Sequence, residues 1–163
     1  MKGWPIMDID GKKFGARMIK RHMRGKGKTS EWNGNYRFGK NPSYYSMKAI
    51  NWIKSIELEE GITIQHAETR GGEKRLENGD SYIKVDGYCS ENNTIYEFHG
   101  DYWHGNPLIY NPTEINKKSK KSYGELYELT KLKERCIEEM GYNLVIMWEN
   151  VWDAHNNANT GTG

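Results

Sequence analysis

Residues 96–107, with the sequence YEFHGDYWHGNP, place acidic, basic and aromatic side chains at the end of an expected strand. Glu97 and His99 are two positions apart, so on a β-strand their side chains point to the same face. His104 follows between two glycines, in what we expect to be a loop or a first helical turn. A histidine there can act as a general base, because its reference pKa of about 6.5 is close to physiological pH.

A second carboxylate comes from the preceding expected strand. Asp86 lies near the end of the run YIKVDGY, and the run TIYEFHG follows after a short turn, which predicts a hairpin. Paired strands bring Asp86 and Glu97 to one end of the sheet, where two carboxylates can hold a divalent cation against a phosphate. Mg²⁺ suits these oxygen ligands, and Mn²⁺ can substitute for it. The alternatives are that Asp86 is a turn residue before a glycine and that the strand's polar residues simply face water.

Aromatic and basic residues beside these groups indicate a nucleic-acid partner. Tyr102 and Trp103 are adjacent in a polar segment, so both cannot easily point into a core, and exposed rings can stack on bases or insert between them. Core packing is the ordinary alternative. The run KKSKK can contact phosphates or form a solvated basic loop. Its lysines are Lys117, Lys118, Lys120 and Lys121.

The charge of the chain is unevenly distributed. Residues 1–40 hold eleven Lys or Arg against three Asp or Glu, a net charge of +8, and the remainder holds thirteen against nineteen, a net charge of −6. A basic arm favours binding to a polyanion, because neutralised phosphates release counterions; a solvated tail is the alternative. The arm residues expected to contact DNA are Arg21, Arg24, Lys26 and Lys28.

Hydrophobic periodicity predicts the elements that position these residues. The expected elements are a helix from Ser43 to before Gly61, a strand at 62–66, turns at 69–80, a hairpin of 82–88 with 94–100, a helix at about 123–140, and a strand at 142–148 buried on both faces. This order predicts an α/β domain, a mixed sheet flanked by helices, over residues 43–153. Residues 1–42 are expected to form the basic arm, and residues 154–163 a disordered tail.

Size and cysteine content indicate one domain in a reducing compartment. The 163 residues suffice for a single core, and the two cysteines form no CxxC pair. No apolar run approaches the length of about 18 residues that a membrane span needs, and the first residues lack the apolar core of a signal peptide. We therefore expect a soluble cytoplasmic protein that is not secreted and has no membrane partner.

The motifs VDGY, YEFHGDYWHG and LVIMWENVW together resemble the very-short-patch repair (Vsr) endonucleases and their phage and homing-type relatives. Those enzymes belong to the PD-(D/E)XK restriction-endonuclease-like group. The resemblance covers residues 43–152. It implies a restriction-endonuclease-like mixed sheet and metal-dependent cleavage of double-stranded DNA.

The resemblance assigns roles to individual residues. Asp86 falls on the family's metal-binding aspartate, and Glu97 falls on the glutamate of the wider PD-(D/E)XK pattern. His99 and His104 fall on the two histidines of the signature, of which His104 would transfer the proton. The aromatic pair after His99 matches the rings that the repair enzymes insert into the base stack. Trp148 and Glu149 match a Trp-Glu pair after the last strand, with a structural role.

Three departures separate this chain from the repair enzymes. Its GNP run replaces the His and Cys residues that bind zinc, so no structural zinc is expected. Its first helix has no glutamate near the start, which leaves that role to Glu57, to Glu73 or to no residue. Asp101 replaces a cysteine and becomes a candidate extra metal ligand. The phage-type relatives fit better than the mismatch-repair enzymes.

The leading hypothesis is a Mg²⁺-dependent DNA endonuclease, nicking or cutting both strands, of the phage or mobile-element homing type. His99 or Lys84 would stabilise the phosphate, and a homodimer is one way to cut both strands. The alternatives are a DNA-binding module with a degenerate nuclease site, a mismatch-repair nicking enzyme, and a structural protein of a larger assembly.

Overall fold

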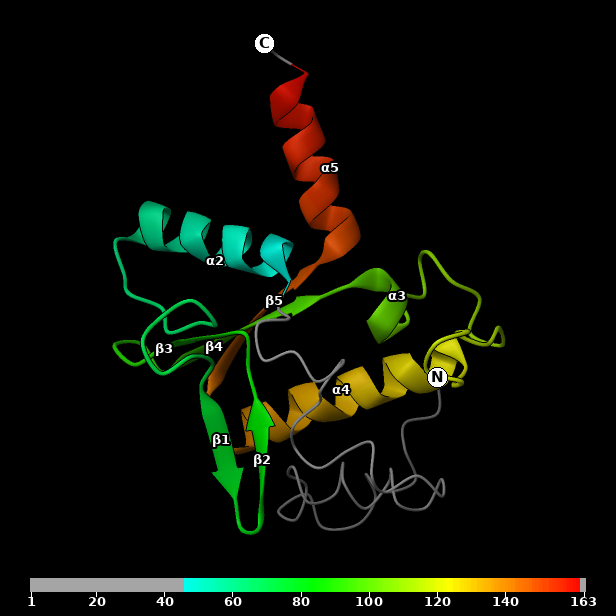
Figure 1. The fold of residues 1–163 in the computed structure, drawn as a ribbon, viewed down its shortest axis with the longest axis horizontal. Coiled ribbons are helices and arrows are strands. Elements are labelled where there is room, and N and C mark those ends of the chain that lie inside the picture. The colour runs from blue at the N-terminus through cyan, green and yellow to red at the C-terminus, as the bar shows by residue number, and fades with distance from the viewer. Residues whose placement is uncertain (1–45, 162–163) are drawn as a thin grey trace.

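A three-stranded sheet lies between two helices in the computed structural model, which describes residues 46–161 (Figure 1). The elements in chain order are α2 (Met47–Glu60), β1 (Arg75–Asn78), β2 (Ser81–Lys84), β3 (Gly87–Cys89), β4 (Thr94–His99), α3 (Asp101–His104), α4 (Tyr123–Glu139), β5 (Asn143–Trp148) and α5 (Glu149–Thr160). This confirms the mixed α/β class. The predicted basic arm, with its four DNA-contacting residues, lies outside the described residues.

The sheet is mixed because a hairpin and a crossover meet on its central strand. β3 pairs antiparallel with β4, with Gly87 opposite Tyr96, and β4 pairs parallel with β5, with His99 opposite Trp148. A parallel pair requires a crossover, which α4 supplies. β1 and β2 form a separate two-stranded hairpin. β4 is therefore the strand on which the rest of the fold is organised.

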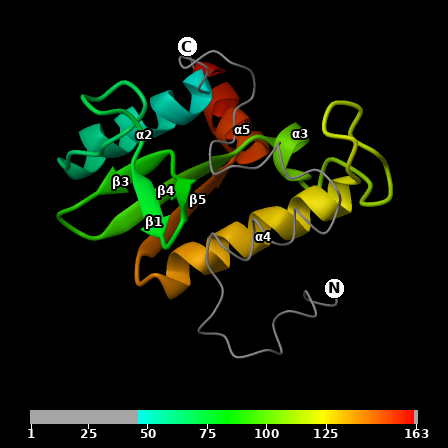
Figure 2. The ribbon, with the colours of Figure 1, turned by 60° about the horizontal axis from the view of Figure 1, so that its bottom comes forward.

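Every residue of β4 is buried, because each face of the strand is covered by a different helix (Figure 2). Tyr96 and Phe98 pack with Trp52 of α2. Ile95 packs on the other face with α4 residues that include Leu132 and Ile137. Since side chains alternate along a strand, Glu97 and His99 share the face of Ile95 and point toward α4. The face assignment made from period two is confirmed.

Caps define the ends of α2 and α4, and the predicted end of α2 before Gly61 and the predicted start of α4 at Tyr123 agree with the structure, although α2 begins at Met47 and not at Ser43. The Ser46 hydroxyl accepts a hydrogen bond from the Ala49 N–H, and Gly61 ends α2 in the left-handed region at φ 65°. Ser122 and Glu125 form a capping box at the start of α4. Each cap satisfies backbone groups that the helix end would otherwise leave unpaired.

Three strand predictions need correction. Residues 62–66 form no strand but a single bridge, in which Gln65 exchanges backbone hydrogen bonds with Tyr88. The segment 69–80, expected to be turns, contains β1; it was missed because the buried Leu76 stands between the charged Arg75 and Glu77, which gives little apolar pattern. The expected strand 82–88 breaks after Lys84 and resumes at Gly87, so Asp86 lies in the break.

The C-terminal part also differs from its predictions. β5 is not buried on both faces, because none of its residues is fully buried and Val145 is exposed; it is also an edge strand of the sheet. The tail expected to be disordered from residue 154 instead continues α5 to Thr160. Trp152 packs on the α2 side of the core, and Lys48 of α2 contacts Glu149 and Asp153, each at 2.8 Å. These contacts hold the first turns of a helix whose asparagine-rich end has low helix propensity.

No helix in residues 46–161 is both long and apolar enough to cross a membrane.

Gly105 lies against the backbone of the first turn of α4, and its replacement by alanine is expected to destabilise the protein by about 2–4 kcal/mol. Gly105 has φ 66°, and a Cβ built there would lie 2.1 Å from the backbone oxygen of Tyr123. Gly61 is the matched control: its φ is 65°, but a Cβ would meet nothing within 4 Å. Gly61→Ala should cost only about 1 kcal/mol of backbone strain. Urea unfolding measures both costs, and equal costs would contradict the close approach at Gly105.

Candidate functional site

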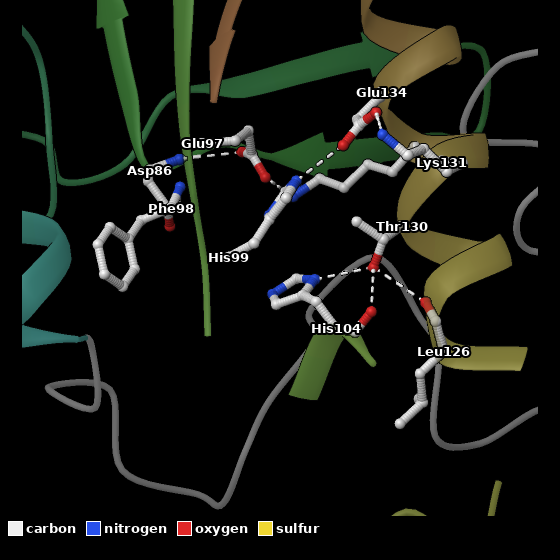
Figure 3. Close-up of polar contacts among 10 residues, drawn as sticks. Asp86, Glu97, Phe98, His99, His104, Leu126, Thr130, Lys131 and Glu134 are labelled. Atoms are coloured by element: carbon white, nitrogen blue, oxygen red, sulfur yellow. Dashed lines mark hydrogen bonds and ion pairs between the residues drawn. The ribbon is translucent and has the colours of Figure 1, made fainter. Parts of the chain in front are cut away.

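Asp86 and Glu97 are brought side by side at the junction of β3 and β4. Gly87 pairs with Tyr96, so the next residues along the register, Asp86 and Glu97, face each other. The Asp86 N–H donates to Glu97 Oε1 at 3.2 Å, and the Phe98 N–H donates to Asp86 Oδ2 at 2.8 Å. Each carboxylate is thus held by a backbone donor on the opposite segment. The prediction that Asp86 and Glu97 lie at the same end of the sheet is confirmed, and Figure 3 shows the contact between the Asp86 N–H and the Glu97 carboxylate.

A lysine from α4 completes this group. Lys133 Nζ lies 2.7 Å from Glu97 Oε2, and the Glu97 side chain is only 2% exposed. Burial alone would lower the pKa of Lys133, but the negative charges of Glu97 and Asp86 outweigh it and raise that pKa above its ordinary value. Lys133 therefore keeps its positive charge in contact with Glu97 and within the electrostatic reach of Asp86.

The surroundings of Asp86 disfavour the ionised form of its carboxyl group. Burial, followed by the negative charge of Glu97, raises its pKa from 3.8 to about 7, although Lys133 and the Phe98 N–H act in the opposite direction. A carboxylate that resists ionisation in this way gains from any cation placed beside it. The Asp86 and Glu97 pair therefore has one half-buried cation, Lys133, and capacity for more positive charge.

The His99 ring is held by the carboxylate of Glu134, a residue of α4. His99 is fully buried at the end of β4, and its Nε2 lies 3.0 Å from Glu134 Oε1. Lys131 Nζ contacts Glu134 Oε2, also at 3.0 Å. Burial alone would raise the pKa of Glu134, but the hydrogen bonds from His99 and Lys131 lower it below its ordinary value. The Glu134 carboxylate therefore stays ionised and orients the His99 ring.

His104 presents a neutral imidazole beside His99. Their ring centroids are 4.5 Å apart. Burial first, and then the electrostatic influence of the neighbouring His99 and Lys133, lower the pKa of His104 well below 6.5. At neutral pH the ring is uncharged, as a general base must be before it accepts a proton.

Thr130 of α4 selects the tautomer of His104. His104 Nδ1 lies 3.0 Å from Thr130 Oγ1, and the Thr130 hydroxyl donates to the Leu126 carbonyl oxygen at 2.9 Å. When the single hydroxyl hydrogen is donated to the Leu126 carbonyl oxygen, Nδ1–H is the donor to Oγ1 and the lone pair lies on Nε2. Figure 3 shows Nε2 pointing away from Thr130. The free lone pair is the proton acceptor that the predicted role requires.

Asp101 does not join the two carboxylates. Its Oδ1 accepts hydrogen bonds from Asn106 Nδ2 at 2.7 Å and from the Asn150 N–H at 3.4 Å, while its own N–H donates to Glu149 Oε1. Within residues 46–161, no group of three or more His, Cys, Asp or Glu side chains is placed to hold a metal ion. The expected extra ligand instead ties α3 to the start of α5. Glu149, predicted to be structural, makes the same connection.

The two glutamates considered for the missing helix acid occupy different places. Glu57 Oε1 accepts the Ile64 N–H at 2.7 Å, so this carboxylate holds the chain leaving α2. Glu73 lies 2.7 Å from Lys84 Nζ, and its negative charge contributes to the raised pKa of Asp86. Of the two, Glu73 faces the candidate site. Lys84, considered for phosphate binding, is paired with Glu73.

The two aromatics predicted to contact bases lie in a packed cluster. Tyr102 is half-buried, and its ring meets Trp103 at 4.9 Å and both Tyr110 and Tyr123 at 6.1 Å between centroids. Their contact with DNA remains a prediction. Three lysines of the KKSKK run are exposed, and the fourth, Lys121, is half-buried.

Sequence reasoning missed the α4 residues of the site, which are Thr130, Lys133 and Glu134. They follow Leu126 at steps of four, seven and eight, and Ile137 continues the series, so they lie on the face that packs on β4. Figure 3 shows Thr130 and Glu134 reaching from α4 toward His104 and His99. The signal in the sequence was three polar residues at positions where helical periodicity predicts core.

No protein-family model matches this chain, and no curated protein matches it.

Proposed function

We propose that this protein is a Mg²⁺-dependent DNA endonuclease that hydrolyses phosphodiester bonds. The observation that carries the proposal is one row of groups between β4 and α4. Asp86 and Glu97 lie at one end with Lys133, and the neutral His104 lies beside the ordered His99 at the other. This row combines a cation-attracting pair, a phosphate-binding ammonium and a proton acceptor, which hydrolysis of a phosphodiester requires.

The donor set fits Mg²⁺. Mg²⁺ binds to one or two carboxylates and retains waters, so Asp86 and Glu97 would suffice to hold it. The raised pKa of Asp86 supports this, because a divalent cation would offset the charge that now disfavours its ionisation. When bound, the ion supplies Lewis-acid polarisation of water and of a phosphate oxygen.

The residues of the chain perform the remaining tasks. His104 Nε2 accepts a proton from the attacking water as its oxygen forms a bond to phosphorus, and the bond from phosphorus to the leaving oxygen breaks. Glu134 keeps His99 oriented against the His104 ring, and Thr130 keeps the His104 lone pair on Nε2. Lys133 neutralises charge that develops on the phosphate. His99, fully buried, orders the site rather than transferring the proton.

We also propose that the domain has a restriction-endonuclease-like fold. A central strand carrying Glu97 and His99, an antiparallel neighbour that follows Asp86, and a helical crossover to a parallel strand support a restriction-endonuclease-like sheet. The resemblance of the motifs to phage and homing-type relatives of Vsr supports double-stranded DNA as the substrate. We also propose that the protein acts in the cytoplasm.

One observation favours a second function, a DNA-binding module with a degenerate nuclease site. Glu97 Oε2 is already held by Lys133 at 2.7 Å, and no third acidic or histidine ligand joins the two carboxylates within the described residues. A lysine in the place of a metal ion could preserve the fold after loss of catalysis.

The two functions are separated by metal dependence. The endonuclease should nick supercoiled plasmid in Mg²⁺ or Mn²⁺ and not in EDTA. A binding module would give no product and would bind DNA equally well with and without Mg²⁺, with an affinity that falls as salt rises. Absence of salt-sensitive DNA binding would exclude both functions.

The Mg²⁺ requirement is expected to depend on pH through Asp86. Its pKa of about 7 means that, at lower pH, the ion must displace a proton from this ligand. The Mg²⁺ concentration for half-maximal nicking should then rise about tenfold for each pH unit below 7 and become constant above it. Mg²⁺ titrations of nicking at about pH 6 and about pH 8 measure the effect. Equal midpoints would contradict a role for Asp86 as a ligand.

A further inference from the structure

Two large apolar side chains are exposed immediately after the helix that carries His104. Leu108 is 81% exposed and Ile109 is 52% exposed. They belong to the segment between α3 and α4, which projects from the body at the α3 end in both ribbon views (Figures 1 and 2). Branched aliphatic side chains at a loop tip are costly to leave in water, so an adjacent pair beside a candidate active site indicates a contact surface.

The turn that displays this pair is held rigidly by a buried asparagine. Asn106 Oδ1 accepts the Leu108 N–H at 3.0 Å, and the Asn106 carbonyl oxygen accepts the Ile109 N–H, also at 3.0 Å. Asn106 Nδ2 donates to Asp101 and to Asn150. The backbone that carries the pair is therefore fixed relative to α3, and both side chains are exposed.

A second buried asparagine in the same segment displays positive charge. Asn116 Oδ1 accepts the N–H groups of Lys118 and Ser119, both at 2.9 Å, and its Nδ2 donates to the Tyr102 carbonyl oxygen of α3 at 2.8 Å. Lys117, Lys118 and Lys120 are exposed on this turn. One segment thus presents an apolar pair and a cationic turn, both anchored to the helix of His104. This combination fits a duplex, whose phosphates bind lysines and whose base steps accept apolar side chains.

The packed aromatic cluster makes the apolar pair the better candidate for insertion. Tyr102 contacts three rings, including Tyr110 and Tyr123, which stack at 4.2 Å. Moving Tyr102 into DNA would dismantle this cluster. Leu108 and Ile109 could enter the base stack without loss of protein packing.

We propose that Leu108 and Ile109 form an apolar wedge that inserts between base pairs of double-stranded DNA beside the bond to be cut. The lysines of the Asn116 turn hold the adjacent phosphates. The inference rests on the proposed DNA substrate, but it does not require cleavage.

The test measures unstacking of bases in the absence of cleavage. The full chain in EDTA is mixed with a duplex that carries 2-aminopurine at several positions, and the rise in fluorescence on binding reports unstacking. The double variant Leu108→Ser with Ile109→Ser should lose most of this rise and bind about tenfold more weakly, with the same dependence on salt. Leu58→Ser is the matched control, because Leu58 is 85% exposed on α2, and it should leave both measurements unchanged.

The outcomes separate the wedge from the nuclease. A wild-type rise that the double variant retains in full, or DNA binding without any rise, overturns the wedge. A change in oligomeric state in the double variant, with an unchanged rise, assigns the pair to a contact between copies of the chain and also overturns it. A rise that depends on Leu108 and Ile109 in a protein that never nicks DNA supports the wedge and removes the proposed catalysis.

Discussion

His104→Gln is expected to slow nicking of supercoiled DNA by a factor of about 10² to 10⁴, which is the usual contribution of a general base. The reason is the lone pair on Nε2, which Thr130 fixes and which the lowered pKa keeps free of a proton at neutral pH. Glutamine retains a polar group of similar reach but cannot accept the proton. Rates at saturating Mg²⁺, with DNA affinity measured separately, isolate this effect on the chemical step.

Thr130→Val is the matched control for His104. It preserves the shape of the side chain but removes the hydroxyl that accepts from His104 Nδ1–H and donates to the Leu126 carbonyl. Both tautomers of His104 then become accessible, so the rate should fall to a value between wild type and His104→Gln. If His104→Gln cuts as fast as wild type while the folded structure is retained, His104 is not the base.

Asp86→Asn is expected to abolish cleavage and at the same time to stabilise the metal-free protein. A carboxyl whose pKa is raised on folding stabilises the native state only while it is protonated. That contribution is complete below about pH 4 and is lost as pH rises to about 7. A shift from 3.8 to about 7 corresponds to a cost on the order of 4 kcal/mol at neutral pH.

The neutral amide of Asp86→Asn avoids this cost and can still accept the Phe98 N–H. Because Lys133 loses the favourable interaction with the Asp86 charge, the net gain in the free energy of unfolding should be smaller, about 1–3 kcal/mol. Urea unfolding in EDTA at about pH 8 measures it, and the gain should vanish at about pH 4. A variant less stable than wild type at both pH values would contradict the charge assigned to Asp86.

Glu97→Gln provides the opposite sign within the same pair. Glu97 is buried against Lys133 at 2.7 Å, so removal of its charge leaves that ammonium with the charges of Asp86 and Glu73 and without its contacting partner. Breaking a buried ion pair from one side is generally destabilising. Glu97→Gln should therefore lower stability while Asp86→Asn raises it, although both should lose cleavage. Opposite stability effects combined with the same loss of activity would separate catalytic roles from structural ones.

The sequence predicted the parts of the site that lie on one strand and its neighbour. Period-two alternation placed Glu97 and His99 on one face, and the hairpin signal placed Asp86 at the same end of the sheet as Glu97, as the structure confirms. Local pattern suffices there, because side-chain direction along a strand and hairpin pairing are both short-range properties. The end of α2 before Gly61 and the start of α4 at Tyr123 were predicted for the same reason.

The rest depends on contacts between residues distant in the chain. Lys133 and Glu134 are 36 and 35 residues from Glu97 and His99, and on an isolated helix they would be ordinary surface charges. Asp101 was predicted as a ligand from its position between two histidines, but its oxygen is taken by Asn106 and the start of α5, which its neighbours in sequence do not reveal. The prediction of disorder from residue 154 was wrong for a similar reason. Contacts of α5 with Lys48 and with the α2 side of the core hold its first turns, and these contacts join residues distant in the chain.

The most direct test of the account compares wild type and Asp86→Asn for nicking of supercoiled plasmid in the same Mg²⁺ buffer, with EDTA as the blank. The wild-type protein should nick the plasmid in Mg²⁺, and Asp86→Asn should not, even though the variant is at least as stable as wild type. Equal nicking by the two proteins would contradict the claim that the strand-end carboxylates form a metal-dependent catalytic site.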